Sequence, residues 1–111
     1  MSLSLRRSEL FIRDFEIQVD WYFRRAGEEI AVGYLEALDR TLAQLARHPG
    51  LGRIRHFRHP KLQGLRSFRV APPFNRHLIF YRFDASVLVA ERVVHGMRNL
   101  PRRLIEPPGS Q

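Results

Sequence analysis

The stretch that decides the fold is LRSFRVAPPFNRHLIFYRFDASVLVAERVV, residues 65–94. It contains three short segments rich in Val, Ile, Phe and Tyr, at residues 65–70, 77–83 and 87–94, with brief linkers between them. Segments of this composition and spacing are typical of β-strands. Strands joined by such short linkers are antiparallel neighbours, because parallel neighbours need a crossover of roughly a dozen residues or more. We therefore expect three consecutive antiparallel strands in the second half of the chain.

Upstream of this stretch, apolar residues at helical spacing predict an α-helix from Ser8 to about Arg25. Ser8 suits the N-cap position, and Glu9 complements the helix dipole in the first turn. The expected buried stripe consists of Phe11, Phe15, Val19 and Tyr22, with Asp14, Gln18 and Arg25 between its members. Other apolar residues, including Ile17, Trp21 and Phe23, lie off this stripe, and a helix that is apolar on more than one face needs cover on both sides.

A second helix is expected from Glu28 to Arg47, directly after a break at Gly27. Its apolar positions at helical spacing are Ala31, Tyr34, Leu35, Leu38, Leu42 and Leu45. The sequence His48-Pro49-Gly50 ends the pattern. Because the connection between the two helices is so short, they should pack as an antiparallel hairpin. Residues 51–64 show no clear periodicity and are expected to form a loop, with at most a short irregular strand.

The expected fold class is α+β, in the order β-αα-βββ. Leu3 and Leu5 alternate with serines and predict a short first strand, and residues 99–104 predict a short turn of helix. Two layers follow, a helical hairpin packed on one face of an antiparallel sheet, with the other sheet face left open. We expect residues 1–104 to form a single domain and residues 105–111 to fray.

The composition describes a basic, cysteine-free domain. The chain has 111 residues, no Cys and a formal net charge of +8. Residues 51–111 hold 12 of its 19 Lys and Arg but only 3 of its 11 Asp and Glu. The absence of Cys excludes disulfides and thiolate chemistry, and no apolar run approaches the roughly 18 residues of a membrane span. We therefore expect a cytoplasmic protein with no membrane association and one positive surface, which would attract nucleic acid, an acidic protein segment or an anionic surface.

Several motifs along the chain resemble the ParE branch of the RelE/ParE toxin superfamily. They are Asp14-Phe15, Tyr34 with Leu38, Pro49-x-x-Gly52-Arg53, Leu65-Arg66-Ser67, His77-x-Ile79-Phe80-Tyr81-Arg82 and Arg92-Val93-Val94-His95-Gly96-x-Arg98-x-Leu100. Together they cover nearly the whole chain, and the last is the most specific. One departure is Asn99, where the family usually has Asp.

This resemblance implies a bacterial type II toxin that a cognate antitoxin holds inactive by wrapping its C-terminal segment over the toxin surface. ParE-like toxins block replication by trapping DNA gyrase on cleaved DNA, so they bind rather than catalyse. The expected protein therefore has DNA gyrase as its target, no catalytic residue, no cofactor and no metal. Direct nucleic-acid binding would be secondary, and oligomers with the antitoxin are expected.

Two other functions stay open. The related RelE-like toxins are ribosome-dependent endonucleases that cut messenger RNA with basic residues and, commonly, a tyrosine near the C-terminus. Here no Tyr follows Tyr81, and Leu104 lies where RNA-cleaving relatives tend to place one. If the chain were RelE-like, its catalytic residues would be Arg69, His95 and Arg98, with His95 as the general base. The third possibility is a non-toxic basic module that binds nucleic acid.

The candidate target-binding residues are the basic groups around the strands and the C-terminal motif. They are Arg66, Arg69, Arg82, Arg92, His95 and Arg98. The candidate antitoxin-binding residues are aromatic side chains off the core stripes and one arginine, namely Trp21, Phe23, Phe57 and Arg53. His56-x-x-His59 lacks the further ligands that a metal site needs.

Overall fold

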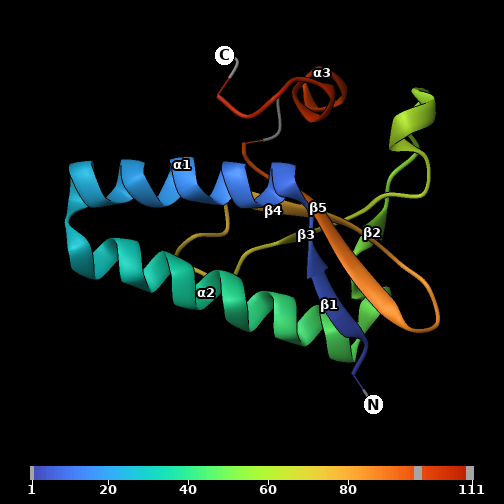
Figure 1. Ribbon diagram of the computed structural model, residues 1–111, viewed down its shortest axis with the longest axis horizontal. Coiled ribbons are helices and arrows are strands. Elements are labelled where there is room, and N and C mark those ends of the chain that lie inside the picture. Colours follow the sequence, from blue (N-terminus) through green and yellow to red (C-terminus); the bar gives the residue numbers. More distant parts are fainter. Residues whose placement is uncertain (1, 97–98, 110–111) are drawn as a thin grey trace.

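The computed structural model describes residues 2–96 and 99–109 (Figure 1). The elements in order are β1 (Ser4–Arg7), α1 (Glu9–Ala26), α2 (Glu28–Arg47), a 3-10 turn (Pro49–Leu51), β2 (Arg53–Ile54), a second 3-10 turn (Pro60–Leu62), β3 (Arg66–Arg69), β4 (His77–Phe83), β5 (Val87–His95) and α3 (Leu100–Ile105). The expected α+β class, the helical hairpin and the three consecutive strands are confirmed. The loop at residues 51–64 carries the short strand β2.

The sheet is mixed rather than wholly antiparallel. Its strand order is β1-β5-β4-β3-β2, and β1 runs parallel to β5 while the other neighbours are antiparallel. The expectation of an antiparallel sheet is therefore wrong for β1. The short-linker argument holds only for β3, β4 and β5. Between β1 and its parallel partner β5 lie residues 8–86, which include the whole helical hairpin, and this connection is long enough for a parallel crossover.

The main core lies between the hairpin and one face of the sheet. Its fully buried members include Phe11 from α1, Tyr34 and Leu42 from α2, and Ile79 and Tyr81 from β4. Burying these large side chains removes most of their apolar surface from water, which is the main driving force of folding. The Ser8 side chain accepts a hydrogen bond from the backbone N–H of Phe11, as an N-cap does.

The second face of the sheet is covered, contrary to expectation. A smaller core there joins residues of β4 and β5 to the segment before β3 and to α3, and it consists of Leu62, Leu65, Leu78, Phe80, Val94, Leu100 and Leu104. Leu78 and Phe80 alternate along β4 with residues of the main core, so they point to the opposite face. The expectation failed because residues 57–65 and α3 are too short for periodicity to reveal that they are packed.

Helix α1 seals the edge of β5 that β1 leaves open. β1 pairs with β5 only as far as Ala90. Beyond it, the Ser8 hydroxyl donates to the Glu91 carbonyl at 2.7 Å, the Val93 N–H donates to the Asp14 carboxylate at 3.1 Å, and the Gln18 amide donates to the Val93 carbonyl at 2.8 Å. Side chains of α1 therefore take the place of a neighbouring strand and satisfy backbone groups that would otherwise lack partners.

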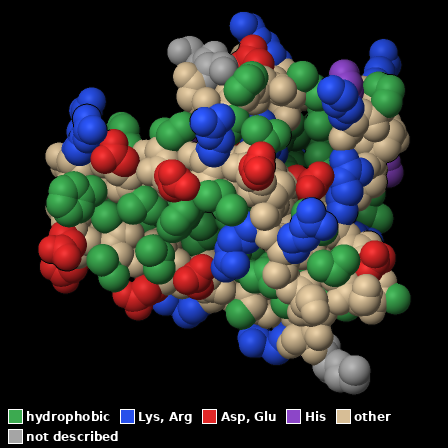
Figure 2. All heavy atoms as spheres, viewed as in Figure 1, with side chains coloured by type: hydrophobic (Ala, Val, Ile, Leu, Met, Phe, Trp, Pro, Cys, Tyr) green, Lys and Arg blue, Asp and Glu red, His purple; other side chains and the backbone are tan. Residues whose placement is uncertain are grey.

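The outer surface of the hairpin exposes apolar side chains. Eight of the twelve large hydrophobic residues exposed in the described part of the chain lie on α1 and α2: Leu10, Ile12, Ile17, Trp21, Phe23, Ile30, Val32 and Leu35. Figure 2 shows hydrophobic side chains gathered along the seam between the two helices, with acidic side chains to either side. No helix among the described residues is long and apolar enough to cross a membrane.

Candidate functional site

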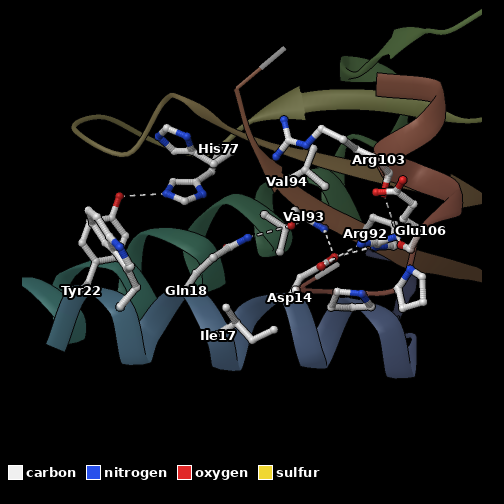
Figure 3. Close-up of a pocket in the computed structure, with 15 residues that line it drawn as sticks. Asp14, Ile17, Gln18, Tyr22, His77, Arg92, Val93, Val94, Arg103 and Glu106 are labelled. Carbon is white, nitrogen blue, oxygen red and sulfur yellow. Dashed lines mark hydrogen bonds and ion pairs between the residues drawn. The ribbon is translucent and has the colours of Figure 1, made fainter. Parts of the chain in front are cut away.

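A cavity of about 560 Å³ lies where the end of β5 faces α1 and the C-terminal segment. Its lining comes from α1 (including Ile17 and Trp21), from the end of β5, and from residues 103–109 (Figure 3). Glu106 to Gly109, part of the segment expected to fray, thus form one wall. This volume falls in the range of roughly 300–1,000 Å³ that ligand sites occupy.

A cluster of aromatic and polar side chains links the helices to the sheet at one side of this cavity. The Tyr22 hydroxyl lies 2.8 Å from the Nε2 atom of His77, and the Tyr34 hydroxyl donates to the Gln18 amide oxygen. Burial lowers the pKa of His77 to about 4, with the nearby His95 adding to the effect. Burial also raises the pKa of both tyrosines. The side chains of His77, Tyr22 and Tyr34 are therefore neutral at physiological pH.

His95 stands at the exposed end of β5 beside two arginines. Its ring meets the ring of His77 edge to face, with centroids 4.9 Å apart. Partial burial lowers the pKa of His95, and the positive charges of Arg103 and Arg76 lower it further. The imidazole is thus neutral at pH 7 and able to accept a proton, while its two cationic neighbours favour an anion nearby.

Arg92 occupies a structural position rather than a surface one. Its side chain is only 6% exposed and is ion-paired with Asp14, and its Nη1 group donates to carbonyls of Arg103, Leu104 and Glu106. This burial removes Arg92 from the surface that a target can touch. From the sequence, Asp14 and Gln18 were expected to lie between the buried positions of α1. The spacing of Phe11, Asp14, Gln18 and Tyr22, however, is that of one helical stripe, and this spacing could have indicated that Asp14 and Gln18 face the sheet.

The structure does not bring the remaining candidate target-binding residues into one cluster. Arg66 donates to the Gly52 carbonyl at 2.9 Å and lies over the ring of Phe83, on the hairpin side of the sheet. Arg82 points to the other face, where it donates to the Lys61 carbonyl at 2.6 Å. Exposed Arg69 donates to the Asn75 carbonyl at 2.8 Å. Arg98 lies outside the described residues.

The candidate antitoxin-binding residues also divide into two groups. Trp21 and Phe23 are more than half exposed and lie in the second half of α1, at the end of the molecule away from β2 (Figure 1). Arg53 is exposed on β2, the strand at the opposite edge of the sheet from β1. Phe57 is partly buried against the smaller core, with its ring 6.4 Å from that of Phe80. Trp21 and Phe23 therefore belong to a different surface from Arg53 and Phe57.

Metal chemistry finds no support in the described part of the chain. No three His, Asp or Glu side chains among the described residues come together in an arrangement that could hold an ion. Both carboxylates that line the cavity already have cationic partners, Asp14 in Arg92 and Glu106 in Arg102. What the cavity offers instead is neutral imidazole, a guanidinium group and apolar walls.

Comparisons with known proteins agree on this small α+β fold. A chain from the chromosomal ParDE toxin–antitoxin system of P. aeruginosa superposes with a TM-score of 0.69 at 17% identity, covering 86% of this chain and 98% of that one. A chain from the RelBE2 toxin–antitoxin complex of Mycobacterium tuberculosis gives 0.52 at 20% identity, covering 86% and 99%. Among curated proteins, none matches this sequence.

A protein-family model supports a more specific assignment than these similarities of fold. The model described as the ParE toxin of the type II toxin–antitoxin system parDE matches residues 5–100, which is most of the sequence. The chain belongs to this ParE toxin family.

Proposed function

We propose that the chain inhibits DNA gyrase by binding it, without catalysis, and that a cognate antitoxin neutralises it. The absence of catalysis is inferred from the charged and titratable groups that surround His95. Its described neighbours supply positive charge, but both lining carboxylates are ion-paired. The pKa values of the nearest tyrosines, half-buried Tyr22 and buried Tyr34, are raised by burial. RNA cleavage without a metal needs a proton donor as well as a base, and this cluster supplies only a base and cations.

The expected antitoxin finds two kinds of surface. The exposed apolar residues of α1 and α2, with Trp21 and Phe23 at one end, offer anchors of the type enriched at interface hot spots. The basic residues of the second half of the chain, Arg53 among them, favour an acidic segment and speed its approach. The two solved neighbours come from toxin–antitoxin systems, which supports a partner of this kind. Because the two surfaces lie at different places, one extended antitoxin segment would have to cross the molecule to use both.

A RelE-like endonuclease is the second candidate, and one observation favours it. His95 is exposed and neutral at pH 7, with Arg76 and Arg103 close enough to lower its pKa. A neutral imidazole beside cations is a suitable base for activating a 2′-hydroxyl, and the cations suit the charge of a phosphorane. Arg69 and Arg98 were the other residues expected for this reaction.

Expression of the chain without its antitoxin separates these functions. Gyrase poisoning predicts filamentation with DNA damage while protein synthesis continues. Rapid arrest of translation with cut messages would replace it with the endonuclease, and undisturbed growth would overturn both toxic activities. Messenger RNA from cells that express the chain or its His95→Gln variant sharpens the comparison. An endonuclease that uses His95 as its base cuts messages only when the histidine is present, whereas a gyrase poison leaves messages uncut in both cases.

A further inference from the structure

The cavity beside His95 has a polar end and an apolar wall. The apolar wall is formed by Ile17 and Trp21 of α1 and by Pro107 and Pro108 of the C-terminal segment. Both α1 residues are among the exposed large hydrophobics, so this wall faces open space rather than packed protein. Trp21 also packs edge to face on Tyr22, with ring centroids 5.3 Å apart, and this contact orients the indole.

The polar end carries positive charge that the described protein does not neutralise. Asp14 is paired with Arg92 at 2.7 Å and Glu106 with Arg102 at 2.6 Å, so each lining carboxylate already has a cationic partner other than Arg103. The guanidinium of Arg103 has no hydrogen bond or ion pair with another described residue, and its Nε–H is buried without an acceptor. The buried Nδ1 atom of His77 also lacks a partner. Buried polar groups without partners cost free energy, which a ligand with suitable oxygen atoms would recover.

The Arg103 side chain is aimed at this end of the cavity. Figure 3 shows it extending from α3 toward His77, which begins β4 and pairs with the last residue of β5. Its Nη1 atom lies 3.7 Å from where a Cβ on Gly96 would stand, and its charge lowers the pKa of His95. The guanidinium therefore approaches the end of β5 and can present a planar pair of donors to a carboxylate or phosphate.

We propose that this cavity binds a small molecule with an aromatic body and one anionic group. The aromatic body lies against Ile17, Trp21 and the two prolines, and the anionic group is held by Arg103. This binding is independent of the proposed gyrase inhibition, because it requires neither gyrase nor DNA.

The test uses two indoles of similar size, one anionic and one neutral, which are added to the isotope-labelled chain and followed by nuclear magnetic resonance. Indole-3-acetate carries the ring and the carboxylate, and indole-3-ethanol carries the same ring with a hydroxyl. We expect indole-3-acetate to shift the amide signals of Ile17, Trp21 and residues 93–95 saturably. It should bind about tenfold more tightly than indole-3-ethanol, because a charge-assisted pair with Arg103 accounts for the difference.

Two variants, each of which removes one positive charge, test whether Arg103 holds the anionic group of the ligand. Arg103→Gln should bring the affinity for indole-3-acetate down to that of indole-3-ethanol. The backbone carbonyl of Arg103, which Arg92 uses, is untouched by this change. Arg40→Gln, on the exposed part of α2 away from the cavity, should leave both affinities unchanged. Circular dichroism checks that each variant is folded. If Arg103→Gln does not fold, the comparison of the two indoles on the unmodified chain still tests the proposal.

Three results would overturn the proposal. The first is equal affinity for the two indoles, and the second is equal loss of binding in both variants. The third is a set of shifts confined to the exposed apolar residues of α2. None of these results bears on gyrase, so failure here leaves the proposed function standing.

Discussion

Asp14 of α1 and Arg92 of β5 form a two-pronged ion pair inside the molecule. The Nε and Nη2 groups of Arg92 donate to the two carboxylate oxygens at 2.7 and 2.9 Å, and each side chain is 6% exposed. The carboxylate also accepts the Val93 N–H, while Arg92 reaches the carbonyls at the end of α3. One pair thus joins α1, β5 and α3, and it fixes the floor of the cavity.

Asp14→Asn should destabilise the fold severely. The amide keeps the shape of the side chain but leaves the guanidinium buried without a counter-charge, which costs about 3 kcal/mol or more. Urea unfolding at constant pH measures this. The matched control is Asp20→Asn on the same helix, whose pair with Arg24 is exposed, so its cost should stay within about 0.5 kcal/mol. Equal costs for the two variants would show that the buried pair does not hold these segments together.

Gly52→Ala should be costly for a purely steric reason. The backbone of Gly52, at φ −69° and ψ 147°, suits any residue. An added Cβ, however, would lie 2.6 Å from Cε1 and 2.7 Å from Cζ of Tyr81. That ring cannot move freely, because its buried hydroxyl accepts the Gly52 N–H at 2.8 Å and donates to the Pro49 carbonyl at 2.6 Å.

The expected cost of Gly52→Ala is about 2 kcal/mol in unfolding free energy. Gly50→Ala serves as the control, since nothing lies within 4 Å of its added Cβ, and it should change stability by less than about 0.5 kcal/mol. If thermal and urea unfolding gave the same values for both variants, the close approach of Tyr81 would not explain why glycine occupies position 52.

The low pKa of His77 makes stability depend on pH in a defined direction. The folded-state pKa is about 4 and the ordinary value is 6.5, so between these values the unfolded chain binds more protons. Stability is therefore full above pH 6.5 and falls as the pH drops toward 4, by about 3 kcal/mol in all. The described groups that face His77 are Tyr22 from α1, Tyr34 from α2 and His95 from β5.

His77→Gln removes this titration while keeping a group that can bond the Tyr22 hydroxyl. The variant starts less stable, but the stability it loses between pH 7 and pH 4 should be smaller than that of the unmodified chain by about 3 kcal/mol. Denaturant unfolding at both pH values gives the two differences, in which the other titrating groups cancel. Identical differences would mean that His77 is protonated in the folded protein well above pH 4.

Arg98→Ala should relieve toxicity without weakening the antitoxin complex. Arg98 belongs to the most specific motif of the sequence and was expected to contact the target, and arginines are frequent at interface hot spots. Growth after induction measures toxicity, and co-purification measures antitoxin binding. Arg40→Ala, which removes an exposed arginine of α2, should remain fully toxic. Full toxicity of Arg98→Ala would remove Arg98 from the target-binding set.

The elements that periodicity and capping describe were predictable from the sequence. Ser8 and Gly27 mark the ends of α1, and the Val- and Phe-rich runs mark β3, β4 and β5. Short local signals suffice for such elements, because caps and alternation act over a few residues. The family was equally readable, from motifs that the family model then matched over residues 5–100.

The candidate site was harder to predict because long-range contacts define it. Arg92 looked like a surface cation until its partner Asp14 was placed beside it, and the sequence separation of 78 residues gives no local signal. The register of β5 also shifts, since Tyr81 pairs with Ala90 but Phe80 pairs with Arg92. Glu91 is skipped, so simple alternation cannot assign Arg92 to a face. No local sequence pattern marks Arg103 as a cavity residue, because its position depends on where α3 packs.

Inhibition of gyrase by the purified chain tests the central claim most directly. Purified gyrase, relaxed plasmid and ATP are combined with increasing amounts of the chain, with and without its antitoxin, and the DNA is resolved on a gel after protein removal. Our account predicts that supercoiling stops, that broken plasmid accumulates, and that the antitoxin restores activity. Normal supercoiling at a large excess of a chain that is toxic in cells would contradict it.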